Sequence, residues 1–140
     1  MKITLAQLNY HVGNFDRNSR LIIDTINQAE SEGSDLVVFS ELSLTGYPPH
    51  DLLEYREFID NCNRYLEIIA GHCLSTGAIV GAPAINKGES GKKLFNAAWF
   101  LADGKIKDVC YKSLLPTYDI FDEYRYFEPS TDFNIIEFKG

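Results

Sequence analysis

A carboxylate at the end of a short apolar segment is the first candidate for chemistry. Glu41 directly follows residues 35–40 (DLVVFS), whose composition is that of a buried strand in a parallel sheet. Ligand-binding and catalytic groups in open α/β sheets collect at the carboxyl ends of strands. Burial at that place would raise the pKa of the Glu41 carboxyl and suit it to act as a general base near neutral pH. The alternative is a solvated loop residue, since single glutamates are mostly exposed.

A lysine about seventy residues further along has a similar placement. Lys112 ends the strand expected at residues 105–111, where a cation could stabilise an oxyanion or hold a nearby carboxylate ionised. The alternative is an ordinary surface lysine at a strand end. Lys112 also opens a segment, residues 112–129, that is rich in aromatic side chains and has no clean periodicity. Such a cluster could form core, a subunit interface or the lining of a small-molecule pocket.

The elements that must position these side chains alternate along the chain. Strands are expected at residues 2–8, 35–40, 78–85, 94–101, 105–111 and 133–138, and helices at residues 17–32 and 51–74. The first strand is apolar on both faces, which indicates burial, and Asn14 could cap the first helix. The early strand–helix–strand units predict parallel strands, whereas the Asp103-Gly104 turn predicts a hairpin. The expected fold class is therefore α/β with a mixed β-sheet.

Composition narrows the class of protein. The 140 residues include 45% hydrophobic and 24% charged residues with a net charge of −7, which fits one soluble globular domain rather than a nucleic-acid binder with a basic stripe. No apolar run approaches the ~20 residues that span a bilayer, and no signal peptide is recognisable. We therefore expect a cytoplasmic protein without a membrane partner. Three cysteines lack metal-ligand spacing and are expected to be reduced, buried thiols: Cys62, Cys73 and Cys110.

Three segments together resemble the nitrilase superfamily of carbon–nitrogen hydrolases. They are the opening KITLAQLNYHVGNFDRN, the element FSELSLTGYPP around Glu41, and YKSLLPTYDIFDEYRYFEP around Lys112. The combination of TGYPPHDLL with K-x-x-LP-x-Y-x-x-FDE-x-RYF is more specific, and it is similar to the glutaminase domain of glutamine-dependent NAD synthetases. The resemblance covers nearly the whole chain. It implies that residues 1–140 are the N-terminal portion of a nitrilase-type α-β-β-α sandwich, incomplete at its C-terminal end.

The resemblance also implies roles for individual residues. Glu41 matches the general base of the family and Lys112 matches its catalytic lysine. Substrate-binding positions are implied at Tyr47, Tyr118, Phe121 and Glu123. Among these, Tyr118 matches an aromatic residue that contacts glutamine, and Glu123 matches an extra acidic residue that some members place near the triad. The nucleophilic cysteine of the family lies downstream of the lysine segment, so we expect this chain to lack it and to be inactive alone.

The implied activity is hydrolysis of the glutamine side-chain amide. L-glutamine would be the substrate, with no metal and no organic cofactor in this segment. In the synthetase family, ammonia passes to a C-terminal synthetase domain of the same chain, which uses ATP and Mg to amidate deamido-NAD. Nitrilase-type enzymes usually oligomerise, so the resemblance also implies a homo-oligomer. No glycine-rich phosphate-binding loop occurs in these residues. Two alternatives are a stand-alone nitrilase-type amidase for another small amide and a non-catalytic interaction module of the same fold.

Overall fold

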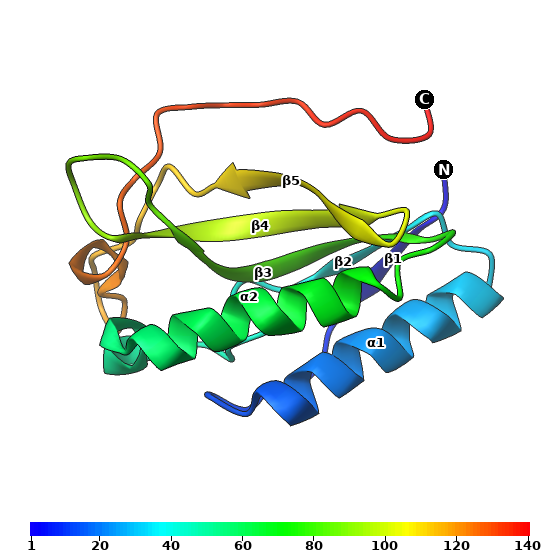
Figure 1. Cartoon of the computed structure of the whole chain (residues 1–140), viewed down its shortest axis with the longest axis horizontal. Helices are drawn as coiled ribbons and strands as arrows, with labels where there is room; N and C mark the ends of the chain where they lie inside the picture. The colour runs from blue at the N-terminus through cyan, green and yellow to red at the C-terminus, as the bar shows by residue number, and fades with distance from the viewer.

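Two helices cover one face of a mixed sheet in the computed structural model, which describes residues 1–140 (Figure 1). The five strands, in their spatial order, are β1 (Ile3–Ala6), β2 (Leu36–Phe39), β3 (Gly77–Ile85), β4 (Leu94–Ala102) and β5 (Lys105–Tyr111). The helices are α1 (Phe15–Ser31) and α2 (Arg56–Ala70), with short 3-10 turns η1 (His50–Glu54) and η2 (Glu123–Arg125). Strands β1, β2 and β3 run parallel, and β4 and β5 each run antiparallel to the preceding strand. The expected α/β class with a mixed sheet is confirmed.

Local sequence explains where the first helix begins and which side it buries. The Asn14 side chain accepts a hydrogen bond from the backbone N–H of Arg17 at 3.1 Å and so caps α1, as expected. Ile22 and Ile26 lie one turn apart on the side of α1 that faces the sheet, and both are completely buried. Burial of each such side chain contributes about 1.5–3 kcal/mol of hydrophobic stabilisation. Neither α1 nor α2 combines the length and apolar composition needed to cross a bilayer.

The second helical segment differs from the expected single helix. Residues 51–74 divide into η1 and α2, because Tyr55 between them has an extended backbone. The Asp51 carboxylate accepts a hydrogen bond from the Tyr126 hydroxyl at 2.5 Å and pairs with Arg125 at 3.2 Å. These contacts tie η1 to the region of η2, far along the sequence.

Two of the three thiols lie in the core between the helices and the sheet. Cys62 and Cys73 are completely buried, as expected, and burial raises the pKa of each thiol to about 12. The expectation of burial is wrong for Cys110, which is half-buried on β5 and donates a hydrogen bond to Asn134 Oδ1 at 3.1 Å. All three cysteines are free thiols.

The first strand is more exposed than its composition suggests. β1 pairs only with β2 and is the edge of the sheet. Ala6 packs against the helix-side core, so the alternation of a strand places Ile3 and Leu5 on the opposite face, where Leu5 is 79% exposed. The expectation that β1 is buried on both faces is therefore wrong.

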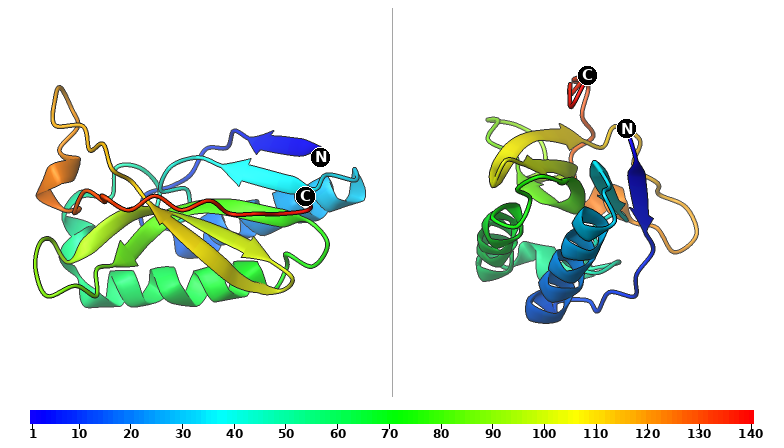
Figure 2. Two further views of the ribbon diagram at one scale, coloured as in Figure 1. Left: turned by 90° about the horizontal axis from the view of Figure 1, so that it is seen from above. Right: turned by 90° about the vertical axis from the view of Figure 1, so that its right-hand side faces the viewer.

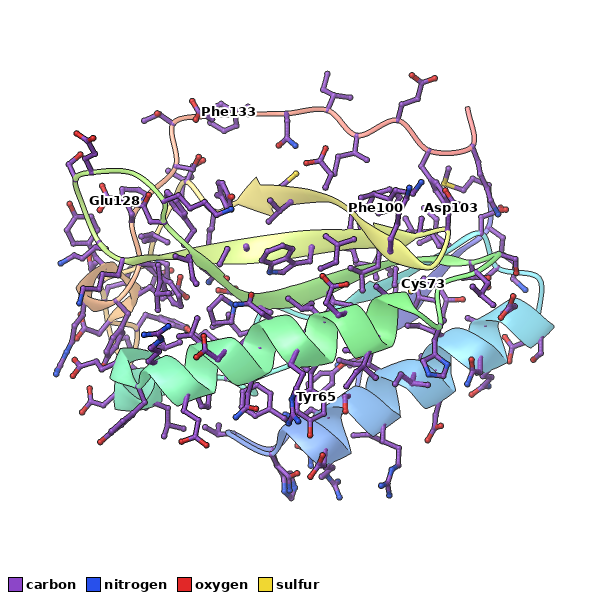
Figure 3. The ribbon with its side chains drawn as sticks, in the orientation of Figure 1. Tyr65, Cys73, Phe100, Asp103, Glu128 and Phe133 are labelled. Atoms are coloured by element: carbon purple, nitrogen blue, oxygen red, sulfur yellow. The ribbon has the colours of Figure 1, made fainter.

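The face of the sheet away from the helices is crossed by the extended residues 131–140 (Figure 2). Phe138 packs edge-on against Phe100 with ring centroids 5.2 Å apart. Ile135 is 97% exposed, and Phe133, on the extended segment in Figure 3, is 84% exposed. The strand expected at residues 133–138 is absent. A strand needs a neighbouring strand edge for its backbone hydrogen bonds, and this segment crosses the face of the sheet instead.

Candidate active site

The strand directions bring the two predicted catalytic side chains to one edge of the sheet. β2 and β3 are parallel, and β4 and β5 reverse direction twice, so β2 and β5 point the same way. Glu41 follows β2 and Lys112 follows β5, and therefore both lie at the carboxyl-end edge of the sheet. η2 lies beyond that same edge, at the end to which the β5 arrow points (Figure 1).

A tight turn after β2 fixes the backbone around Glu41. The Leu44 N–H donates to the carbonyl of Gly81 on β3 at 3.1 Å, and the Gly81 N–H donates to Ser43 Oγ at 3.2 Å. This close approach requires a glycine, because a Cβ on residue 81 would lie 2.6 Å from the Ser40 carbonyl oxygen and would collide with the Leu42 backbone. Glu41 is therefore held by a turn docked on a central strand.

Replacing Gly81 by alanine is expected to push this turn away from β3. The collision is with backbone atoms, which cannot rotate aside, so we expect a loss of about 1–3 kcal/mol in the free energy of unfolding. Urea denaturation measures it. Gly88→Ala is the matched control, since its Cβ would meet only the side chain of Asn86 in an exposed loop. Equal stability of the two variants would contradict the account of the turn.

Lys112 joins two carboxylates. Its backbone N–H donates to the Asn96 carbonyl at 2.8 Å, which continues the pairing of β5 with β4. Its ammonium nitrogen Nζ lies 2.7 Å from Glu41 Oε1 and 2.9 Å from Glu123 Oε2. The Lys112 ammonium therefore forms ion pairs with two carboxylates, Glu41 after β2 and Glu123 in η2.

Glu123 is the buried member of this pair of acids. It opens η2, and the Phe127 N–H donates to its carbonyl at 3.0 Å, while the Phe127 side chain is buried in the main core. The second carboxylate oxygen, Oε1, accepts a hydrogen bond from the Tyr47 hydroxyl at 2.9 Å. Buried carboxylates are stable only when paired and hydrogen-bonded, and both conditions are met here.

Asn96 is a member of the cluster that sequence reasoning missed. It lies on β4 and is 3% exposed, and its amide nitrogen Nδ2 donates to Glu41 Oε1 at 2.6 Å. The same nitrogen lies 3.3 Å from Glu123 Oε2. A signal was present in the sequence: asparagine is depleted in strands, and this one interrupts the otherwise apolar segment LFNAAWFLA.

The electrostatics of Glu41 differ from the expectation. Burial raises its pKa, but the hydrogen bonds from Lys112 and Asn96, together with the charge of Lys112, lower that pKa below its ordinary value. The Glu41 side chain is also 43% exposed, so the expected desolvated carboxyl with a raised pKa is wrong. For Lys112, burial lowers the pKa, but the hydrogen bonds to Glu41 and Glu123 raise it above its ordinary value. At neutral pH the site therefore holds an ionised acid beside a protonated amine.

Aromatic rings extend the cluster on one side. The rings of Tyr47 and Phe121 have centroids 6.3 Å apart, and those of Phe121 and Tyr118 are 5.7 Å apart. The structure thus links Glu41, Lys112, Glu123 and Tyr47 through hydrogen bonds and places Phe121 and Tyr118 in a row beside them. Tyr118 is the outermost and is largely exposed.

No cysteine takes part in these contacts, and no metal site is formed. Cys62 and Cys73 lie in the core beneath the sheet, and the Cys110 thiol bonds to Asn134. No group of three or more His, Cys, Asp or Glu side chains is arranged to hold a metal ion. The cluster can supply a proton acceptor and a positive charge.

Comparison with known proteins identifies the family. The family model described as carbon-nitrogen hydrolase matches residues 2–140. The chain belongs to the carbon–nitrogen hydrolase family. Among the relatives of this carbon–nitrogen hydrolase chain, the glutamine-dependent NAD(+) synthetase of Thermotoga maritima is 39% identical over 137 residues, which are 98% of this chain and 23% of the relative. The same-named enzyme of Aquifex aeolicus is 36% identical over 140 residues, which are 100% of this chain and 24% of the relative.

Solved structures agree on the fold of the carbon–nitrogen hydrolase chain. The glutamine-dependent NAD+ synthetase from Acinetobacter baumannii superposes with a TM-score of 0.88 at 33% identity, covering 99% of this chain and 26% of that one. An amidase from Nesterenkonia sp. AN1 gives 0.81 at 22% identity, covering 100% and 54%. The nitrilase-type fold is therefore confirmed. The chain spans about a quarter of the length of the curated synthetases it matches.

Proposed function

We propose that Glu41 and Lys112 belong to an amide-hydrolysing site, and that in the full-length protein this site releases ammonia from L-glutamine for NAD synthesis. The observation that carries the proposal is the 2.7 Å contact between Glu41 Oε1 and Lys112 Nζ at the carboxyl-end edge of the sheet. An ionised acid can accept a proton, and the adjacent ammonium can stabilise a developing oxyanion. The names of the relatives support glutamine as the amide.

The mechanism assigns one proton acceptor and one cation. Glu41 accepts the proton from a cysteine thiol, and the sulfur keeps the electron pair and attacks the carbonyl carbon of the glutamine side chain. Lys112 stabilises the negative oxygen of the tetrahedral intermediate. Glu41 returns the proton to the departing nitrogen, so that ammonia leaves and a thioester remains. Water, deprotonated by Glu41, then attacks the thioester, and glutamate and the thiol are released.

The nucleophile in this proposal is a cysteine outside residues 1–140. The three cysteines in these residues are placed elsewhere, and the curated relatives are about four times as long as this chain. We propose that residues 1–140 are the N-terminal portion of a glutaminase domain, with a C-terminal synthetase domain that uses ATP and Mg to amidate deamido-NAD. Assembly of several copies of the full-length protein is part of the same proposal.

The aromatic row is proposed to receive the substrate. Tyr47, Phe121 and Tyr118 offer apolar ring faces beside the two charged groups, and pockets for small molecules combine apolar walls with a few placed polar groups. Glu123 holds both Lys112 and Tyr47 through its two oxygens. It therefore links the charged part of the site to the aromatic part.

A chain of residues 1–140 is expected to release no glutamate from L-glutamine, whereas the full-length protein is expected to do so. The reason is that the proposed thiol comes from outside this segment. Glutamate release can be measured by a coupled assay, with full-length Glu41→Gln protein as the background. Turnover by residues 1–140 above that background would contradict the proposal. Faster hydrolysis of short aliphatic amides than of glutamine by the full-length protein would instead favour a stand-alone amidase.

A further inference from the structure

Asn96 is a buried polar side chain of the cluster and lies on a strand inside the sheet. Its strand, β4, pairs with β3 from Leu94 to Leu101 and with β5 from Ala97 to Ala102. Its carbonyl accepts the Lys112 N–H at 2.8 Å, and its side chain is almost completely buried. An asparagine side chain has only two rotatable bonds, so the position of its amide follows directly from the position of the strand.

The Asn96 amide contacts the same two oxygen atoms as the lysine. Its Nδ2 donates to Glu41 Oε1 at 2.6 Å and lies 3.3 Å from Glu123 Oε2. Lys112 Nζ donates to those two oxygens at 2.7 Å and 2.9 Å. Two donors and two acceptors thus form a closed ring of contacts. The lysine reaches these oxygens through a long, flexible side chain, whereas the amide is attached to the strand through a short one. Of the two donors, the amide is therefore the one whose position is set by the sheet.

One carboxylate oxygen remains uncommitted. Glu123 Oε1 accepts the Tyr47 hydroxyl, and Glu123 Oε2 and Glu41 Oε1 belong to the ring. Glu41 Oε2 accepts no hydrogen bond from another residue. The Glu41 side chain is 43% exposed. Both hydrogen bonds of the ring to Glu41 therefore end on Oε1 and leave Oε2 outside the ring.

We propose that Asn96 is a positioning residue, which fixes Glu41 through Oε1 so that Glu41 Oε2 is the atom that takes the proton of the nucleophile. This proposal rests on the proposed function. In the step concerned, the S–H bond breaks, an O–H bond forms at Oε2, and the electron pair stays on sulfur. Without Asn96, Lys112 would be the only group in the ring that donates hydrogen bonds to Glu41 and Glu123. The Asn96 amide is a second hydrogen-bond donor to both carboxylates. The hydrogen bond from the Asn96 amide favours the ionised form of Glu41 and helps to lower its pKa.

The test replaces Asn96 in the full-length protein by alanine and by aspartate, which has the same shape but supplies no amide donor. Loss of the donor removes a hydrogen bond to ionised Glu41, so its pKa should rise and the acid limb of kcat/KM for glutamine should move to higher pH. At a pH below the pKa of Glu41, a rise of one unit in that pKa lowers kcat/KM about tenfold. The activity of the variant should recover as the pH is raised. Asn96→Asp should move the limb further than Asn96→Ala, because it adds a third carboxyl.

Asn18→Ala is the matched control. Asn18 is also completely buried and donates to the carbonyls of His11 and Leu44 at 2.8 Å and 3.0 Å, outside the ring. We expect it to lower the melting temperature while the acid limb stays in place. Asn96 variants that lose activity equally at every pH, as a purely structural residue would, overturn the proposal.

A second readout does not depend on glutamine. The side-chain carboxyl carbon of Glu41 can be titrated by ¹³C NMR in the full-length protein and in Asn96→Ala. A higher pKa in the variant supports the positioning role, and an unchanged pKa overturns it. If the wild-type protein does not hydrolyse glutamine, the proposed function is wrong, and the titration still decides the role of Asn96.

Discussion

Full-length protein carrying Glu41→Gln is expected to hydrolyse glutamine about 10²–10⁴ times more slowly than the wild type. Glutamine has the shape of glutamate and can still accept hydrogen bonds from Lys112 and Asn96 through its amide oxygen. It cannot take a proton from a thiol near neutral pH. The loss should therefore fall on kcat, with a small change in KM, as steady-state glutamate release will show.

Glu67→Gln is the matched control for this substitution. Glu67 is an exposed residue of α2, and the same change of carboxylate to amide there should leave kcat and KM close to the wild-type values. The melting temperatures of both variants should stay near that of the wild type. A Glu41→Gln protein with a normal kcat would remove Glu41 from the chemistry.

Replacement of Lys112 by methionine is expected to lower kcat by about 10²–10³-fold through the loss of oxyanion stabilisation. Methionine keeps much of the length of the side chain without its charge. The loss of the cation and of its hydrogen bond should also raise the pKa of Glu41, so the acid limb of the rate profile should move to higher pH. Both effects are visible in one series of kcat and kcat/KM measurements across pH.

Lys105→Met provides the comparison for the lysine. Lys105 is the exposed first residue of β5, the same strand that Lys112 follows. Its replacement should change neither kcat nor the position of the acid limb. A Lys112→Met protein with the kcat and pH profile of the Lys105→Met protein would show that the ammonium has no part in the reaction.

The positions of the two catalytic candidates could be predicted from sequence because they depend on local signals. An apolar strand followed at once by Glu41, and a hairpin strand followed by Lys112, place both side chains at strand ends. The helical crossover makes β2 and β3 parallel, and the two short connections after β3 reverse the direction twice, so that β2 and β5 point the same way. The resemblance supplied Glu123 and the aromatic residues, whose segment has no periodicity from which their placement could be inferred.

Other features depend on contacts between distant segments. The lowered pKa of Glu41 reflects donors from β4 and from the end of β5, and counting those donors requires the register of three strands. The apolar neighbours of Asn96 mark it as unusual in a strand, but they do not reveal that its amide contacts Glu41 and Glu123. The extended segment at residues 133–138 has the alternation of a strand, but whether such a segment finds a strand edge is not decided by its own residues. The exposure of β1 follows from its place at the sheet edge, which composition does not encode.

In the proposed reaction, Glu41 takes the proton of a thiol that attacks the amide carbon of glutamine, and Lys112 stabilises the oxyanion that forms. Mass spectrometry of full-length protein quenched during glutamine turnover tests it directly, since a glutamyl thioester adds a defined mass to one cysteine peptide. We predict an adduct on a cysteine outside residues 1–140 that is lost in Glu41→Gln protein. An adduct on Cys62, Cys73 or Cys110, or one that forms equally in the absence of the Glu41 carboxylate, would contradict the account.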